Sequence, residues 1–294
     1  MFGKPSRLGV GAMSPLQRVA VHVVLLLLCI PAILPFIWMV STSFKLDIDI
    51  YGAAKSGASA FSLASLVPHP IHPQNYPEAL STVPFATYLF NSLGLCATTI
   101  LGAVVSSAIV AYGFARIQFK GRDFWFMIMI STMALPGQVT MIPQFALYRW
   151  LGWYGTYLPL TVPSFAGTAF FIFLLTQFFR TIPMEMAESA RLDGASEWAI
   201  FSRIVLPLSK PALATCALFQ FLGTWNDFMG PLIYINNPVK YTLAYGLQQF
   251  YSSYDGKWAQ LMAAATLFTL PIIILFFFAQ KTFIQGVATT GGRN

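Results

Sequence analysis

Charged residues are scarce in this sequence. Only 9% of its 294 residues are Asp, Glu, Lys or Arg, while 56% are apolar; in an average soluble domain about 25% are charged. Several continuous apolar runs reach the ~20 residues that a helix needs to cross a bilayer. They do not show the alternating pattern of membrane β-strands. The composition therefore predicts an all-α membrane protein.

The sequence also lacks the signatures of several kinds of chemistry. The Gly-x4-Gly-Lys-Ser/Thr phosphate loop does not occur. Cys29, Cys96 and Cys216 each fall inside an apolar run, without the spacing of a disulfide or a metal site. His69 and His72 share one loop, but adjacent prolines break any helix that would align them. We therefore expect no catalytic residue, metal site or cofactor on this chain.

Six apolar segments are predicted to span the membrane as helices: 19–40, 87–114, 124–148, 157–179, 212–235 and 258–280. The first is too long for the core of a signal peptide, so we expect it to remain as an anchor. The third is interrupted at Pro136-Gly137 and at Pro143. A break at membrane depth must be buried in protein or line a cavity, so this one points to a translocation path.

The distribution of basic residues predicts the topology. Six spans place both termini on one side, and twelve of the 17 Lys and Arg residues lie in the tails and in the loops after the second and fourth helices. By the positive-inside rule these segments are cytoplasmic. The net charge of +7 then reflects topology, and we expect no nucleic-acid partner. The predicted segments are the cytoplasmic tails 1–18 and 283–294, the membrane domain 19–282, the cytoplasmic loop 180–211, and the periplasmic loops 41–86 and 236–257.

The segment 188–207 is a polar interruption in an otherwise apolar chain. Thr181 is a candidate N-cap for a first short helix that ends near Asp193. Gly194 suits the left-handed position that follows such a helix. Ser196 is a candidate N-cap for a second helix, so the pattern predicts a helical hairpin.

The second helix of this hairpin should stop at Leu206, because Pro207 disfavours helical geometry in the residue before it. Trp198 and Phe201 fall on one apolar face of that helix. A hairpin that only anchors the loop to the membrane surface fits these signals equally well.

The same segment matches a twenty-residue pattern, E-A-A-x(3)-G-x(9)-I-x-L-P, at Glu188, Ala190, Gly194, Ile204, Leu206 and Pro207. The one departure is Ser189, where the pattern has Ala. This segment resembles the coupling motif of bacterial ABC-importer permeases. From the second predicted helix onward, LGWYGTYLPL, WNDFMGPL, YTLAYGLQQF and TLPIIILFFFAQKTFIQGV are similar to the second permease of maltose-type carbohydrate importers.

The resemblance implies several partners. The 180–211 loop would be a coupling helix hairpin that docks on an ATP-hydrolysing subunit, with Glu188, Arg191 and Asp193 at the rim. Two such subunits would bind ATP and Mg, and a second permease would complete the path. An extracytoplasmic binding protein would deliver a sugar or oligosaccharide. It would meet the outer loop, with candidate contacts Tyr241, Tyr245, Gln248, Gln249 and Tyr251, which an aromatic belt at the membrane interface explains as well.

Trp225, Asn226 and Asp227 are predicted to form a polar cluster at the outer membrane border. Asp227 is the sixteenth residue of the fifth predicted helix, about 24 Å along its axis at ~1.5 Å per residue. An acid at this depth is a functional candidate. We favour a structural role, in bonding to a neighbouring helix or in capping backbone near Pro231.

Two other function classes remain open at this point. An ion-coupled secondary transporter would carry an inverted repeat and buried coupling charges, and neither is evident. A membrane enzyme would need catalytic groups, for which His69, His72 and Glu78 are the nearest candidates.

Overall fold

The computed structural model describes residues 14–50, 66–253 and 257–291, without the side chains of 249–253, 279 and 281–291. Helices are the only regular secondary structure in these ranges, which confirms the all-α prediction. The chain divides into two compact units, each described by itself: residues 1–79 with 254–267, and residues 80–253 with 268–294.

The first unit contains α1 (Pro15–Thr42) and the N-terminal parts of α3 (Asn75–Thr82) and α15 (Trp258–Gly291). Ser14 begins α1 with a capping box, in which its hydroxyl accepts from the Gln17 N–H and the Gln17 side chain accepts from the Ser14 N–H. The Asp47 carboxylate accepts from the Ala259 N–H at 2.9 Å in the first turn of α15. Apolar side chains along α1 are exposed, as suits a helix in lipid.

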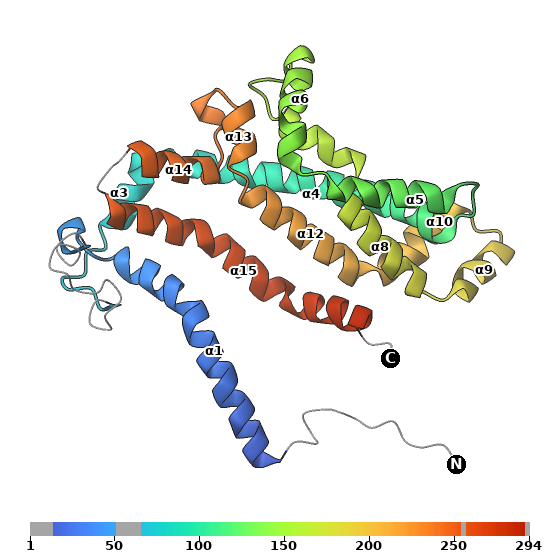
Figure 1. Ribbon diagram of the computed structural model, residues 1–294, viewed down its shortest axis with the longest axis horizontal. Helices are drawn as coiled ribbons and strands as arrows, with labels where there is room; N and C mark the ends of the chain where they lie inside the picture. The colour runs from blue at the N-terminus through green and yellow to red at the C-terminus, as the bar shows by residue number, and fades with distance from the viewer. Residues whose placement is uncertain (1–13, 51–65, 254–256, 292–294) are drawn as a thin grey trace. The chain divides into compact units, whose positions relative to one another are not determined.

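The second unit is organised around α4 (Phe85–Arg116). Two helices, α8 (Ala169–Thr181) and α12 (Lys210–Trp225), lie alongside it (Figure 1). Small residues on α4 permit this approach, since Ala103 and Ala111 are wholly buried. The small-residue spacing of the sequence therefore marks a packing face within this chain.

At Gly102, the segment η4 (Val162–Ala166) lies very close to the backbone of α4. A Cβ built on it would lie 2.5 Å from the Ser164 Oγ and 2.8 Å from the Phe165 ring. Both belong to η4. Only glycine fits this contact without moving η4.

Two buried apolar clusters hold the second unit together. One lies at the C-terminal end of α4 and includes Phe179 and Ile200. The other joins Tyr88 of α4 to Trp225 of α12 and to Leu243. Burial of a large apolar side chain contributes about 1.5–3 kcal/mol, so these clusters fix α8 and α12 on α4.

In the described residues, four helices are long and apolar enough to cross a membrane. The number of candidate spans rises to six if each of two bent helix pairs is counted as one span. The prediction of six spans agrees with the second count in number, although the second bent pair begins at Glu197, inside the predicted loop 180–211, and ends at Trp225. The bent pairs are Arg122–Ala134 with Gly137–Trp150, at 96°, and Glu197–Leu208 with Lys210–Trp225, at 77°. The first bend lies at Pro136-Gly137, where the sequence predicts a break. The chain is therefore a multi-pass membrane protein.

The remaining elements of the second unit outside the polar hairpin are α5 (Arg122–Ser131), η3 (Thr132–Ala134), α6 (Gly137–Trp150), α7 (Leu158–Thr161), α13 (Met229–Tyr234), η6 (Pro238–Lys240) and α14 (Leu243–Ser253). Two of the predicted helix ends are wrong, and one predicted helix has a break that was not predicted. The predicted helix 157–179 consists of α7, η4 and α8, with a break at Gly167, whose φ is +85°. The predicted helix 212–235 ends at Trp225 and resumes as α13, while the predicted helix 258–280 continues as α15 to Gly291.

The predicted outer loop 236–257 is also partly helical, since it contains η6 and α14. Pro238 fits the first turn of η6 because that position needs no N–H donor. The Asn237 side chain accepts from the Val239 N–H at 3.0 Å and begins that turn. Asn237 and Pro238 are therefore local signals for the start of η6. The sequence analysis identified no such signal for α14.

Candidate functional site

The break after α12 separates three residues that the sequence groups as one polar cluster. Trp225 is 1% exposed, and its Nε1–H donates to the Phe268 carbonyl at 3.3 Å. The Asn226 amide donates back to the Leu222 carbonyl at 2.8 Å and ends the helix. The expected cluster is therefore not brought together, because each side chain has its own partner.

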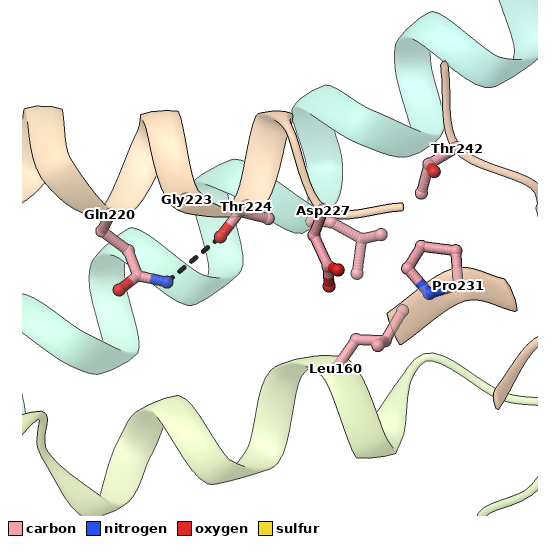
Figure 2. Close-up of a pocket in the computed structure, with 8 residues that line it drawn as sticks. Leu160, Gln220, Gly223, Thr224, Asp227, Pro231 and Thr242 are labelled. Carbon is pink, nitrogen blue, oxygen red and sulfur yellow. Dashed lines mark hydrogen bonds between the residues drawn. The ribbon is translucent and has the colours of Figure 1, made fainter. Parts of the chain in front are cut away.

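Asp227 lies in the break itself and not on a continuous helix, so the predicted axial distance does not apply. Its Oδ1 accepts from the Gly230 N–H at 2.9 Å, which satisfies a free donor at the start of α13. Asn and Asp side chains compete with helical backbone bonds, which is why the helix ends here. In Figure 2 the Asp227 carboxyl group lies near the side chains of Leu160 and Pro231.

Two tyrosines of the segment 236–257, Tyr241 and Tyr245, pack on each other. The rings of Tyr241 and Tyr245 are 4.2 Å apart, and Tyr245 stacks on Phe228 at 5.9 Å. Gln248 is exposed. The side chains of Gln249 and Tyr251 lie outside the described residues. The two described tyrosines thus form an aromatic stack that shapes this surface.

The histidine-containing loop shows no metal geometry. Glu78 accepts a hydrogen bond from Gln260. Within the described residues there is no group of three His, Cys, Asp or Glu side chains that could hold a metal ion. His69, His72 and Glu78 therefore give no support to a metal-dependent enzyme.

The segment 184–208, which we call the polar hairpin, has the turn that the sequence predicts. It comprises α9 (Met184–Leu192), α10 (Glu197–Ile200), the π-helical turn η5 (Phe201–Val205) and α11 (Leu206–Leu208). Gly194 has φ +81°. Its N–H donates to the Arg191 carbonyl at 3.0 Å, and the Ala195 N–H donates to the Ala190 carbonyl at 2.9 Å. This pair of bonds is a Schellman motif, which needs a left-handed residue after the helix.

The caps of the hairpin agree with the sequence at one end only. The Ser196 hydroxyl accepts from the Ala199 N–H at 3.2 Å and begins α10, as predicted. Thr181 is not a cap, because its hydroxyl donates to the Phe178 carbonyl within α8. Pro183 precedes α9 instead.

The predicted stop at Leu206 is also wrong. Leu206 keeps helical φ and ψ of −61° and −47°. Its N–H donates to the Phe201 carbonyl across one π-helical turn, and Pro207 occupies the first turn of α11. A proline there removes no required N–H, so the chain stays helical and bends at Ser209 instead.

Arg116 ties the start of the hairpin to α4. It is 4% exposed, and its Nη2 donates to the Phe179 carbonyl and, at 2.6 Å, to the Ile182 carbonyl. Its Nη1 contacts the Met184 sulfur at 2.7 Å. A cation at these carbonyls satisfies acceptors at the C-terminus of α8. Sequence reasoning missed this role, although a basic residue in the last turn of an apolar helix is a signal for it.

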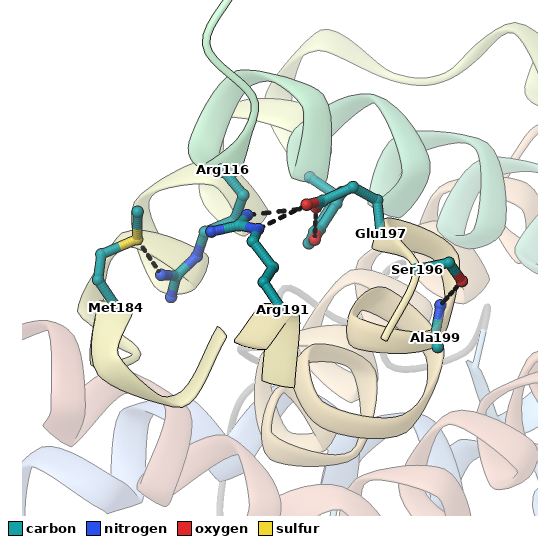
Figure 3. A network of polar contacts seen from close by, with 7 residues as sticks. Arg116, Met184, Arg191, Ser196, Glu197 and Ala199 are labelled. Atoms are coloured by element: carbon teal, nitrogen blue, oxygen red, sulfur yellow. Dashed lines mark hydrogen bonds and ion pairs between the residues drawn. The ribbon is translucent and has the colours of Figure 1, made fainter. Parts of the chain in front are cut away.

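A second contact joins the two halves of the hairpin to α4. Arg191 Nε donates to Glu197 Oε1 at 2.6 Å, and Arg191 Nη2 to Oε2 at 3.3 Å (Figure 3). The Tyr112 hydroxyl donates to Glu197 Oε2 at 2.6 Å. We call Tyr112, Glu197 and Arg191 the anchor network. The hydrogen bonds to Glu197 raise the pKa of Arg191 above its ordinary value, so the guanidinium stays charged. Glu197 was missed as a site residue, and its position in the first turn of α10 was the signal.

The residues of the coupling pattern divide between two faces. Ala190, Ile204 and Leu206 are half-buried against the apolar cluster. Glu188, Asp193, Gly194 and Pro207 are exposed.

Five large apolar side chains of the polar hairpin are exposed. Leu192, at 90%, and Trp198, at 64%, are the most exposed, and the others are Met184, Met186 and Leu208. The hairpin therefore exposes apolar side chains and the acids Glu188 and Asp193, while the Arg191 guanidinium is held by Glu197.

Known proteins share this chain's sequence and fold. Residues 103–289 match the family described as "Binding-protein-dependent transport system inner membrane component". The probable ABC transporter permease protein YurM of Bacillus subtilis is 35% identical over 92% of this chain and 87% of its own length. The trehalose/maltose transport system permease protein MalG of Thermococcus litoralis is 31% identical over 92% of this chain and 95% of its own.

A solved structure has the same fold. It is a bacterial ABC transporter involved in the import of the acidic polysaccharide alginate, with a TM-score of 0.74 and 27% identity over 92% of this chain and 99% of that one. The family match covers more than half of the chain and includes the polar hairpin. This chain therefore belongs to the inner-membrane permease components of binding-protein-dependent ABC transport systems.

Proposed function

We propose that this chain is the second permease subunit of an ATP-driven importer for a sugar or oligosaccharide in a bacterial inner membrane. The observation that carries the proposal is the polar hairpin, with its left-handed Gly194 turn and its exposed apolar tip, in a chain of this family. The relatives support the substrate class, since they include permeases named for trehalose/maltose and for arabinooligosaccharides.

The hairpin is proposed to dock on an ATP-hydrolysing subunit. This chain carries no phosphate loop, so ATP and Mg bind to two partner subunits. Leu192 and Trp198 are the proposed apolar centre of the contact, and Glu188 and Asp193 its polar rim. A buried apolar centre with a polar rim is the usual anatomy of a protein interface.

The anchor network is proposed to transmit the movement of the partner. Tyr112 and Arg116 both lie in the last two turns of α4, and they hold α10 and the α8–α9 junction respectively. A displacement of the hairpin therefore moves α4 with it. Because α12 packs along α4, the movement reaches the break at Asp227.

The other partners follow from the same proposal. Both termini are cytoplasmic, as the basic residues predict. A second permease completes the path, and an extracytoplasmic binding protein meets the segment 236–257 near the stacked Tyr241 and Tyr245. Nothing in the described residues favours the alternative of an ion-coupled transporter.

A matched pair of glycine variants tests the docking. Gly194 and Gly152 both have positive φ, of +81° and +71°, and an added Cβ at either would meet no atom within 4 Å. Valine costs about 1–2 kcal/mol of backbone strain at each. Gly194→Val should lose the ATPase subunit from the complex purified on the tagged full chain, whereas Gly152→Val should keep it. If both variants retained the ATPase subunit and its sugar-stimulated hydrolysis, the hairpin would be a membrane-surface anchor. A chain that purifies alone and transports with an ion gradient would support the alternative.

A further inference from the structure

A cavity of about 280 Å³ lies beside the C-terminal half of α12, within the second unit. One wall is formed by Gln220, Gly223 and Thr224, which share one face of α12, and by Asp227 in the break that follows this helix. Leu160, Pro231 and Thr242 border the same space (Figure 2). Polar and apolar groups thus face one another across a small space.

The polar groups on α12 are held in place by the protein. The Gln220 amide donates to the Thr224 hydroxyl at 3.1 Å (Figure 2), and that hydroxyl lies 2.9 Å from the hydroxyl of Thr99 on α4. An amide has a carbonyl acceptor besides its donors. The Gln220 side chain therefore keeps an acceptor after this contact is made.

Two further polar side chains of the lining, Thr242 and Asp227, are also held by hydrogen bonds to the backbone. The Thr242 hydroxyl accepts from the Tyr245 N–H at 3.4 Å, so its own proton can be donated. The Asp227 carboxylate accepts from the backbone N–H groups of Gly230 and Met229, and a carboxylate has about four lone-pair positions. The cavity therefore offers donors and acceptors whose positions are set before a ligand arrives.

The lining selects for one chemical class. Fixed hydroxyl, amide and carboxyl groups match the hydroxyls of a sugar, and Leu160 and Pro231 match its C–H face. The volume of about 280 Å³ lies just below the ~300–1,000 Å³ of small-molecule sites, which suits one ring and not a chain of rings. The Asp227 carboxylate repels a second anion in a site of low dielectric.

We propose that this cavity is a subsite for one ring of a neutral sugar and that Asp227 excludes acidic sugars from it. This proposal rests on the proposed function as a sugar importer. It adds that the sugar carries no net charge. It separates this chain from the structural relative that takes part in alginate import, since alginate is an acidic polysaccharide.

Gly223 provides a specific block. A Cβ added there would meet no atom within 4 Å, so a leucine extends into the cavity without a clash. Gly94 on α4 is a matched control because it is equally open but does not line the cavity. Both substitutions replace a helical glycine, so their effects on helix propensity cancel in the comparison.

The experiment uses the full-length chain in lipid nanodiscs, free of any partner permease. Binding of glucose, L-arabinose and N-acetylglucosamine, and of glucuronate as the acidic counterpart of glucose, is measured by saturation-transfer NMR. At least one neutral sugar should bind saturably, and glucuronate at least tenfold more weakly. Gly223→Leu should weaken the neutral sugar at least tenfold, Gly94→Leu should not, and Asp227→Asn should narrow the difference between glucose and glucuronate to below threefold.

A second measurement uses the assembled complex, so that a misfolded isolated chain does not decide the result. Gly223→Cys is made with the three native cysteines changed to serine, and its reaction with a maleimide is timed. The same neutral sugar should slow the reaction at least threefold, and glucuronate should not. The proposal is overturned if no neutral sugar has either effect, if glucuronate acts equally, or if Gly223→Leu binds as the wild type does. Loss of the ATPase partner from the complex would instead overturn the proposed function, and the binding results would stand.

Discussion

Tyr112→Phe should loosen the polar hairpin without unfolding the chain. The variant removes one hydroxyl and keeps the ring, which lies 5.1 Å from the Phe201 ring. A hydrogen bond to a charged acceptor contributes about 1.5–3 kcal/mol. The Glu197 side chain is 44% exposed, so solvent screening reduces the contribution to about 1 kcal/mol. This corresponds to about a fivefold change in a local opening equilibrium, at ~1.4 kcal/mol per factor of ten.

Hydrogen exchange measures that opening directly, since amides exchange through local unfolding. Backbone amides of residues 188–205 should exchange about fivefold faster in Tyr112→Phe. Tyr157→Phe is the control, because it also loses a tyrosine hydrogen bond, at 3.0 Å to the Lys240 carbonyl, but outside the hairpin. Equal hairpin exchange in the wild type and in Tyr112→Phe would refute the claim that the anchor network holds the hairpin to α4.

Three further variants test other contacts of the second unit. Arg116→Ala removes the side-chain donor to the Phe179 and Ile182 carbonyls and should destabilise the protein by about 2–4 kcal/mol, read as a fall in the detergent melting temperature. Leu192→Glu changes a side chain that is 90% exposed and should alter stability by less than about 0.5 kcal/mol, yet abolish retention of the ATPase subunit on a pull-down. Gly102→Val places carbon against the Ser164 hydroxyl and should cost about 1–3 kcal/mol, whereas normal melting of this variant would show that η4 can move away.

Local chemistry explains which features could be predicted from the sequence. Gly194 follows a helical run and precedes Ser196, and both the left-handed turn and the cap occur as predicted. These signals act within a few residues and need no distant partner. The span pattern is equally local, because apolar length alone decides whether a helix can cross lipid.

The errors arise where distant contacts override a local preference. Pro207 disfavours helix at Leu206, yet a π-helical turn and the packing of Ile204 and Leu206 on the apolar cluster keep the segment helical. The sequence predicts that Asp227 lies within a helix, because the apolar run continues on both sides of it. The capping of α13 by its carboxyl group could not be predicted without the break.

Arg191 shows why a pattern of residues does not by itself give an interface. In the sequence it stands beside Glu188 and Asp193 as a rim contact for a partner. In the structure the Arg191 guanidinium forms an ion pair with Glu197. Arg191 therefore links the two helices of the hairpin to each other. Around the Gly194 turn, the side chains left for a partner are then apolar, at Leu192 and Trp198, and acidic, at Glu188 and Asp193, and the exposed Arg203 lies further along the hairpin. It follows that the complementary surface on the ATPase subunit should be an apolar cleft with basic residues at its rim.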